Sequence, residues 1–328
     1  MEGLGANPFE AASDGRCASG VLACPGCHAW YPIAGRVLDL LPEAHADSDG
    51  RARFFAEHRE RLEALGIGPP AGSAPDPGFS AQQHQREHFD DLALRRDRFS
   101  YEALGKQPFQ RAVRSLNFEE WAPLIGKGGL ALDIGCADGL STFDLARFDL
   151  EVLALDISPE QIRQAADRAE QEGFRNASFM IADANAIPIA NGVIDTVICY
   201  GSLHHFPDPE RTVGEVARVL APGGSYIGVE NNTTPLRPIF DAIMRLRPIW
   251  LEEAGAHAQI GAGDLHRWSD GTGLTLSTRP IVFLPPHLCN LIGYRASRRL
   301  VQLTDWLFGH IPLLRRWGGL ISISGRRR

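Results

Sequence analysis

The amino-acid sequence predicts an α/β protein built on a Rossmann-like, doubly wound sheet. Between residues 130 and 231, apolar runs of strand length alternate with amphipathic segments of helical length, as expected for parallel strands joined by crossover helices. The first run leads into a turn with two glycines, and the second ends in an aspartate. Open α/β sheets bind nucleotide-like ligands at strand ends of this kind.

The first strand and its turn are predicted in the segment LALDIGCADG, at residues 130–139. Its first five residues form the largely apolar run of a buried parallel strand. Gly135 and Gly139 provide turn positions where a side chain would obstruct the approach of backbone to a ligand. Residues 140–148 continue as a helix whose N-terminus opens onto the turn. The segment therefore predicts a backbone cradle for a nucleotide-like ligand.

The second strand, at residues 152–156, ends in Asp156, roughly 20 residues beyond the glycines. A carboxylate at this position accepts hydrogen bonds from both ribose hydroxyls and would repel a 2′-phosphate. Ser158 begins the following helix as its N-cap, and Gly173 ends it. Asp156 thus indicates an adenosine-type sugar.

The remaining elements continue the same alternation of strands and helices. In chain order they are a strand at 177–182, a strand at 193–200, a helix from 208 that is ended by 222–224, a strand from 225, a strand at 274–283, a helix at 300–308 and a strand at 319–324. Four strands in series already imply a doubly wound sheet.

Taken in order, these elements resemble the class I S-adenosylmethionine-dependent methyltransferases over about residues 89–230, particularly the branch resembling ubiquinone- and menaquinone-biosynthesis enzymes. LDIGCADG matches the cofactor loop of the family, Asp156 its ribose acid, Asp183-Ala184 its adenine-contacting pair, and SLHHF its segment after the fourth strand. The resemblance implies S-adenosylmethionine as methyl donor and a seven-stranded sheet whose last strand is antiparallel. The middle loop position, normally glycine in the family, is Ala137 here.

The resemblance and the loop pattern together define the candidate cofactor site. The residues expected to contact the cofactor are Asp133, Gly135, Cys136, Ala137, Gly139, Asp156, Ile157, Asp183, Ala184 and Tyr200. The carboxylate of Asp133 suits the cationic amino group of a methionine moiety. Cys136 is expected to act as a small apolar filler, with a redox-sensitive thiol as the alternative.

A nicotinamide-dependent dehydrogenase is the obvious competing interpretation, because it also uses a glycine turn and a ribose-binding acid. Dinucleotide binding requires G-x-G-x-x-G, whereas this chain has Asp133 two residues before Gly135 and then only Gly139. A carboxylate near the loop would repel a pyrophosphate. The spacing therefore favours a sulfonium cofactor.

Candidate catalytic residues follow the fourth strand. Methyl transfer from a sulfonium depends mainly on positioning, and a general base contributes when the acceptor is a weakly acidic hydroxyl. His204 and His205 are the candidate bases, with His205 slightly favoured, because ligands bind at this edge; alternatively, the pair only shapes the loop. Phe89, Phe99 and Tyr101 either close the pocket or pack as ordinary helix residues.

Residues 1–45 carry a separate signal that resembles half of a Trm112-like zinc ribbon. Cys24 and Cys27 form a C-x-x-C pair, but residues 7–10, where a second pair is expected, contain no thiol. Structural zinc needs four ligands, so we expect a degenerate ribbon that has lost its metal. A surviving site that uses Cys17 together with this pair is the alternative.

The rest of the chain divides into three parts. Residues 46–80 are predicted to form a charged helix and a Pro- and Gly-rich linker, and residues 81–328 the methyltransferase domain. Residues 82–94 begin a helical lead-in that the family places over the cofactor site. Residues 231–273 correspond to the substrate lid of the family, and their apolar stretch at 235–250 either buries a greasy acceptor or caps the sheet.

Composition and charge bound the possible partners. The chain has 328 residues and a net charge of -7, which argues against a nucleic-acid partner. After Glu253, however, three acidic residues stand against ten arginines, and this region could rest on a membrane surface or face a phosphorylated carrier lipid. With no run of about 20 apolar residues and no leader pattern, we expect a cytoplasmic protein with reduced cysteines.

The sequence therefore predicts a methyltransferase that acts on an oxygen or carbon atom of a small-molecule or lipid-like acceptor in a biosynthetic pathway. One alternative is a ribosomal-RNA base methyltransferase, which would need an intact, basic ribbon to bind RNA. The other is a non-catalytic partner protein that keeps the fold. Neither the acceptor nor the oligomeric state can be read from the sequence.

Overall fold

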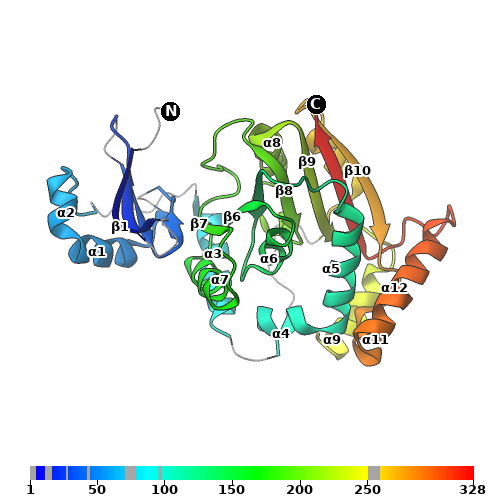
Figure 1. Ribbon diagram of the computed structural model, residues 1–328. Helices are drawn as coiled ribbons and strands as arrows, with labels where there is room; N and C mark the ends of the chain where they lie inside the picture. Colours follow the sequence, from blue (N-terminus) through cyan, green and yellow to red (C-terminus); the bar gives the residue numbers. More distant parts are fainter. Residues whose placement is uncertain are drawn as a thin grey trace.

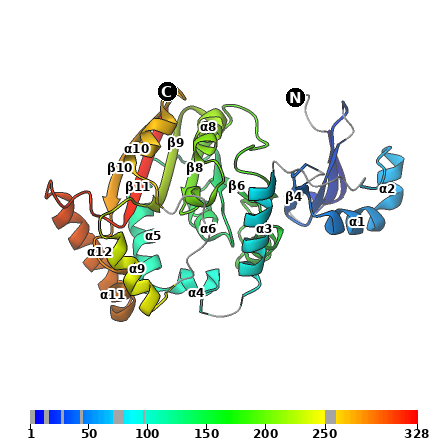
Figure 2. The ribbon, with the colours of Figure 1, turned by 180° about the vertical axis from the view of Figure 1, so that it is seen from behind.

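The computed structural model describes residues 5–11, 17–26, 29–42, 45–70, 79–95, 98–249 and 259–328. They form one mixed sheet with helices packed on both faces (Figures 1 and 2). The sheet has 11 strands in the order β1-β2-β3-β4-β7-β6-β5-β8-β9-β11-β10.

The elements have the following bounds. The strands are β1 (Gly5–Ala11), β2 (Cys17–Ala23), β3 (Trp30–Ala34), β4 (Val37–Asp39), β5 (Leu130–Ile134), β6 (Glu151–Asp156), β7 (Ala177–Ile181), β8 (Ile194–Tyr200), β9 (Leu220–Asn231), β10 (Leu274–Ile281) and β11 (Leu320–Arg327). The helices are α1 (Ser48–Glu57), α2 (Arg59–Ala64), α3 (Ser80–Ala93), α4 (Tyr101–Lys106), α5 (Pro108–Trp121), α6 (Leu140–Ala146), α7 (Pro159–Glu172), the 3-10 turn η3 (Leu203–His205), α8 (Pro209–Val219), α9 (Arg237–Leu246), α10 (Ala262–Ser269), α11 (Pro286–Ile292) and α12 (Tyr294–Gly309).

Seven neighbouring strands of the sheet follow the predicted doubly wound pattern. Strands β7, β6, β5, β8 and β9 pair in parallel, and β11 is antiparallel to both β9 and β10. The chain order reverses between β5 and β8, so the loops after these strands part at the carboxyl edge. This is the switch point at which open α/β sheets bind ligands. The antiparallel last strand is confirmed.

The predicted count of seven strands is wrong, because the N-terminal hairpins extend the same sheet. Strand β4 pairs in parallel with β7 through Val37, Leu38 and Asp39, and β3, β2 and β1 follow by antiparallel pairing. The N-terminal strands therefore do not form the separate ribbon that the sequence suggests.

Alternation along the strands builds a core on each face of the sheet. In β5, Leu132 and Ile134 belong to a cluster with α8 and α10, whereas Ala131 belongs to a cluster with α5 and α12. Successive side chains of a strand point to opposite faces, so both faces of the central strands are dry. The polar groups of the site therefore lie at the carboxyl edge of the sheet.

Buried and half-buried polar contacts fasten the N-terminal strands. Arg51 in α1, 3% exposed, donates from Nε to Oδ2 of Asp39 at 3.3 Å and from Nη2 to the carbonyl of Leu41 at 2.6 Å. Arg36, after β3, donates to the carbonyl of Phe174 at 2.6 Å, beyond α7. The hairpins are thus bonded to the first α/β units and not only to each other.

Some elements differ from the predicted bounds. The helix expected at 300–308 is α12, which begins earlier, and α11 precedes it without having been predicted. Leu220 already belongs to the strand expected from Ser225. Parts of the predicted linker (71–78) and lid (250–258) lie outside the described residues. None of the described helices combines the length and apolar content that a bilayer crossing requires.

The buried Arg51–Asp39 pair yields a stability prediction. Replacing Arg51 by alanine leaves a buried carboxylate without its cation, which should lower the free energy of unfolding by about 3 kcal/mol. Chemical denaturation followed by circular dichroism measures the change. Arg53→Ala, an exposed arginine in the same helix, is the matched control and should change stability by less than about 0.5 kcal/mol. Equal effects of the two substitutions would contradict the role of the pair.

Candidate functional site

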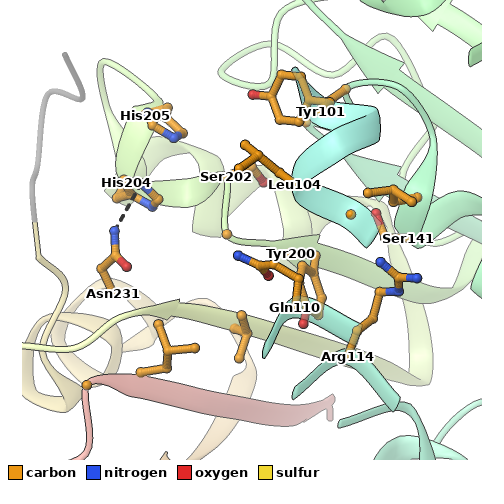
Figure 3. Close-up of a pocket in the computed structure, with 18 of the residues that line it drawn as sticks. Tyr101, Leu104, Gln110, Arg114, Ser141, Tyr200, Ser202, His204, His205 and Asn231 are labelled. Atoms are coloured by element: carbon orange, nitrogen blue, oxygen red, sulfur yellow. Dashed lines mark hydrogen bonds between the residues drawn. The ribbon is translucent and has the colours of Figure 1, made fainter. Parts of the chain in front are cut away.

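A large cavity opens at the carboxyl ends of β5, β6, β7 and β8. Its volume is about 500 Å³, within the range of small-molecule sites. The loops after these strands line one half, and α4, α5, α9 and the segments at 282–286 and 317–320 line the other. Figure 3 shows His204 and His205 across the cavity from Tyr101 and Leu104 of α4.

The turn after β5 takes its shape from close packing. Gly135 has φ of 70°, and a Cβ there would lie 2.6 Å from Cβ of Ser202, in the loop after β8. Gly139 has φ of 88°, and its Cβ would lie 2.8 Å from the ring of Phe143. Gly135 lines the cavity but Gly139 does not. Gly139 lets α6 begin against its own Phe143, and its predicted contact with a ligand stays a prediction.

Ala137 adopts the backbone conformation that glycine would favour. Its φ is 46°, which strains a residue that carries a Cβ. Its N–H donates to Oδ2 of Asp156 at 3.0 Å, so the loop keeps a glycine-like path despite the methyl group. Cys136, next to it, is buried and also lines the cavity.

Asp156 lies at the end of β6 and lines the cavity, as predicted. Its other oxygen, Oδ1, accepts from the N–H of Ser158 at 3.0 Å. Burial raises the pKa of this carboxyl to about 6, although the two backbone N–H groups oppose the shift. The acid is therefore ionised at neutral pH and protonated below about pH 6.

Asp133 is not among the residues that line the cavity, and its predicted contact with a cofactor stays a prediction. It is fully buried, and its Oδ2 accepts from the hydroxyls of Ser141 at 2.8 Å and Thr142 at 2.7 Å. Burial raises its pKa to about 6. The loop carboxylate that does line the cavity is Asp138, which the sequence analysis overlooked although it lies in the same motif. Asp138 pairs with Nη1 of Arg168 at 3.3 Å.

The remaining predicted cofactor residues come together along the same edge. Ile157, Asp183, Ala184 and Tyr200 all line the cavity. Asp183 lies at the start of the loop after β7, and its Oδ1 accepts from the N–H of Asn185 at 2.8 Å. Burial raises the pKa of Asp183. The strand-end loops thus bring eight of the ten predicted cofactor residues to one surface.

His204 is held by a buried carboxylate. Glu230, at the end of β9 and fully buried, has Oε2 at 2.6 Å from Nδ1 of His204, and its Oε1 accepts from the N–H of Leu203 at 2.8 Å. Nε2 of His204 lies 3.3 Å from Nδ2 of Asn231 (Figure 3). A carboxylate on Nδ1 fixes the orientation and tautomer of an imidazole, so that the proton stays on Nδ1 and Nε2 is the accepting nitrogen, here toward the amide of Asn231.

His205, the slightly favoured candidate base, has different surroundings. Its ring lies edge-on to Phe89 of α3, with centroids 5.2 Å apart, and against the ring of His204. Both histidines line the cavity, as do Phe89 and Tyr101, whereas Phe99 does not. The geometry therefore favours His204 over His205 as a base. Glu230 was missed because its partner stands 26 residues earlier in the sequence.

The far half of the cavity is mostly apolar. Its walls include Ile239, Phe240 and Ile243 of α9, together with Leu284 and Trp317. A few polar groups interrupt this surface: Gln110, Arg114, Asn231, Thr234 and Arg237. Such a lining suits an apolar ligand that is oriented by a small number of hydrogen bonds.

The N-terminal thiols show no metal site within the residues that the structure describes. No group of three or more His, Cys, Asp or Glu side chains there could hold a metal ion. The thiol of Cys17 donates to the carbonyl of Ser19 at 3.2 Å. Cys27 and His28 lie outside the described residues, so the loss of zinc stays a prediction.

Comparison with known proteins identifies the central part of the chain. Residues 132–228 match the family described as methyltransferase domain. The chain is 30% identical over 151 residues to the uncharacterized methyltransferase YcgJ of Bacillus subtilis, covering 42% of this chain and 59% of that protein. It is 29% identical over 158 residues to the ubiquinone biosynthesis O-methyltransferase of Xanthomonas euvesicatoria, covering 48% and 65%. The chain thus spans less than two thirds of either relative.

Two solved structures share the fold. One is geranyl diphosphate C-methyltransferase from Streptomyces coelicolor, in complex with Mg²⁺, geranyl diphosphate and S-adenosyl-L-homocysteine; the TM-score is 0.51 at 14% identity, covering 77% of this chain and 100% of that one. The other is phosphoethanolamine N-methyltransferase 2 from Haemonchus contortus, in complex with S-adenosyl-L-methionine; the TM-score is 0.50 at 14% identity, covering 73% and 60%. The two structures show an α/β fold that this chain shares with methyltransferases, and the match to a methyltransferase domain covers residues 132–228.

The strained loop position yields a prediction about stability. In Ala137→Gly the backbone keeps its left-handed conformation, but the strain of about 1 kcal/mol that the Cβ causes is relieved. The greater conformational freedom of glycine in the unfolded chain offsets a smaller part of this gain. We expect the free energy of unfolding to rise by about 0.5 kcal/mol. Ala52→Gly, at an exposed position within α1, is the control and should lower it by about 1 kcal/mol. A loss of stability for Ala137→Gly would contradict the strain.

Proposed function

We propose that the protein is an S-adenosylmethionine-dependent methyltransferase that methylates an oxygen or carbon atom of a small, apolar or lipid-like acceptor. The observation that carries this proposal is that one cavity is lined by the strand-end acids Asp156 and Asp183, by His204 and by an apolar wall from α9. The matched methyltransferase domain supports it.

The residues of the near half fit this cofactor. Asp156 offers a carboxylate to the ribose hydroxyls, Ile157 and Ala184 offer apolar contacts to the adenine, and Asp183 lies beside them. The loop with Gly135 and Ala137 would hold the methionine moiety, with the carboxylate of Asp138 near its ammonium group. When bound, S-adenosylmethionine supplies an electrophilic methyl group.

The residues of the chain have two tasks in the reaction. The cavity walls hold the acceptor in line with the methyl group and exclude water, which is the main source of rate in such a displacement. His204 accepts the proton that the acceptor loses, at Nε2, while Glu230 stabilises the resulting imidazolium through Nδ1. Because both groups are buried beside the cavity, this charge pair is poorly screened.

An apolar acceptor suits the far half. Ile239, Phe240 and Ile243 of α9 present the wall that the sequence placed in the lid. Polar groups at Gln110 and Arg114 of α5 could orient one polar end of the acceptor. We propose that α9 selects the acceptor by burying its apolar part.

The N-terminal strands have no assigned role in catalysis. We propose that they derive from a Trm112-like ribbon whose remaining task is to cover β7, and that they carry no zinc. Metal analysis of the purified protein tests this, since stoichiometric zinc would overturn it.

The raised pKa of Asp156 predicts how cofactor binding depends on pH. The ionised carboxylate accepts hydrogen bonds from ribose, so affinity should be constant above about pH 7 and fall by about tenfold per pH unit well below pH 6. Calorimetric titration with S-adenosyl-L-homocysteine measures the profile. Asp156→Asn should bind more weakly above pH 7 and lose most of the slope. Asp133, with a similar pKa, is unchanged in the variant, so the difference between the two profiles reports Asp156. An unaltered profile would contradict the assignment.

The histidine assignment predicts unequal effects of two neighbouring substitutions. His204→Ala should lower turnover by about 10²- to 10⁴-fold for an acceptor that must lose a proton. Glu230→Gln should give a smaller loss, because the imidazolium loses its counter-charge. His205→Ala is the matched control and should retain most of the turnover.

Turnover is measured as S-adenosyl-L-homocysteine formed in the presence of metabolite and lipid extracts, with mass spectrometry identifying the product that has gained one CH₂. A larger loss in His205→Ala than in His204→Ala would reverse the assignment. Cofactor binding without any product from any extract would favour a non-catalytic partner protein.

A further inference from the structure

We propose that the face formed by α9, α11, α12 and residues 310–319, here called the basic apolar face, docks onto a lipid bilayer that carries anionic headgroups. These elements lie together at one end of the molecule in both views (Figures 1 and 2). Helices α11 and α12 are in contact. Nε2 of His287 in α11 lies 2.7 Å from the carbonyl of Arg247 after α9, and Thr234 before α9 donates to the carbonyl of Trp317 at 3.0 Å.

The basic apolar face gathers most of the exposed large apolar side chains of the protein. Of fourteen such residues in the described part of the chain, eleven belong to it. The most exposed are Leu246 at 88%, Leu313 at 76%, Leu291 at 67% and Trp306 at 62%. Single exposed leucines are ordinary, but a concentration of this kind marks an interaction surface.

The apolar residues of α12 are spaced so that several of them lie on its exposed face. Leu303, Trp306 and Leu307 recur at i, i+3 and i+4 and are all exposed, whereas Val301 and Thr304 are buried on the side that packs against α5. A helix that covers a core would present its polar residues to solvent. Here a tryptophan and two leucines face outward, which is the composition of helices that lie in a membrane interface.

The charge of the basic apolar face favours an anionic bilayer over other partners. Residues 286–319 contain five arginines and one acid, Asp305, although the whole chain carries a net charge of -7. Asp305 is half-buried and its Oδ1 accepts from the N–H of Val282 at 2.8 Å, so it offsets little of the surface charge. Arg299 and Arg316 are exposed. Arginines with long apolar stems beside leucine and tryptophan can reach phosphate groups while the apolar side chains enter the acyl region.

A second copy of the chain is a poor occupant for this face. A two-fold interface sets the same patch against itself, so the arginines of one copy would meet those of the other. Buried like charges of this kind are costly. An anionic lipid surface offers apolar burial and the opposite charge together.

The cavity and this face share wall residues. Ile239 and Trp317 are exposed there and also line the cavity. A lipid-like acceptor could therefore pass from the bilayer into the apolar half without crossing water. This last step rests on the proposed function, whereas docking itself does not.

Vesicle sedimentation of the full chain, without methyl donor, tests the docking. We expect binding to vesicles of phosphatidylcholine with phosphatidylglycerol that weakens as salt is added, and little binding to phosphatidylcholine alone. Trp306→Ser combined with Leu313→Ser should weaken binding by at least about tenfold, and Arg299→Glu combined with Arg316→Glu by a similar factor. None of these four residues lines the cavity.

Matched controls lie on other parts of the surface. Leu94→Ser removes an exposed leucine after α3, and Arg53→Glu reverses an exposed arginine in α1; both should leave vesicle binding unchanged. The proposal is overturned if the wild type does not sediment with anionic vesicles at low salt, or if the controls weaken binding as much as the face variants. It is also overturned if light scattering shows a dimer that Trp306→Ser with Leu313→Ser converts to monomer while vesicle binding stays unchanged. Since cofactor binding is measured separately, failure of docking and failure of methyl transfer are distinguishable.

Discussion

The geometry of the site depends on a carboxylate that never meets solvent. Asp133 lies within β5 and accepts hydrogen bonds from Ser141 and Thr142, in the first turn of α6. These bonds fix the start of the helix against the strand, and so hold both ends of the loop that joins them. Burial works against the ionised form and raises its pKa to about 6, so the two hydroxyls are what keep the charge tolerable. The loop after β5 is therefore held in place by the buried Asp133 and not by the side chains of the loop itself.

The loop after β8, on the other side of the cavity, is also held by a buried acid. Glu230 lies fully buried near the end of β9 and receives hydrogen bonds from the backbone of Leu203 and from the ring of His204. One acid thus sets both the path of the loop after β8 and the orientation of its histidine. The two acids leave the lining of the cavity free for ligands, because neither of them needs to face it.

Local patterns in the sequence predicted the elements whose cause is local. The apolar strands, the glycine turn and the acid at the end of β6 all lie where they were predicted. Alternation, turns and strand ends depend mainly on neighbouring residues, so a local pattern is enough to predict them. The bonds of the buried Asp133 to Ser141 and Thr142 were not predicted, since closeness in sequence to Gly135 says nothing about the face to which a strand residue points. The partnership of Glu230 with His204 depends on the parallel pairing of β8 with β9, and that of β4 with β7 on three residue pairs from distant segments. Neither long-range pairing leaves a local trace.

The N-terminal hairpins also decide where the sheet stops. Without them the edge strand would be β7, whose sequence ASFMI is largely apolar and whose backbone groups would stand open to pairing with other chains. With them, the edge moves to β1, which contains Pro8 and register irregularities around Glu10, both of which hinder the addition of a further strand. The other edge, β10, carries Pro280 next to Arg279. The N-terminal hairpins would thus protect the protein from association through its sheet whether or not they bind a metal, and a fragment that begins after them would lose that protection.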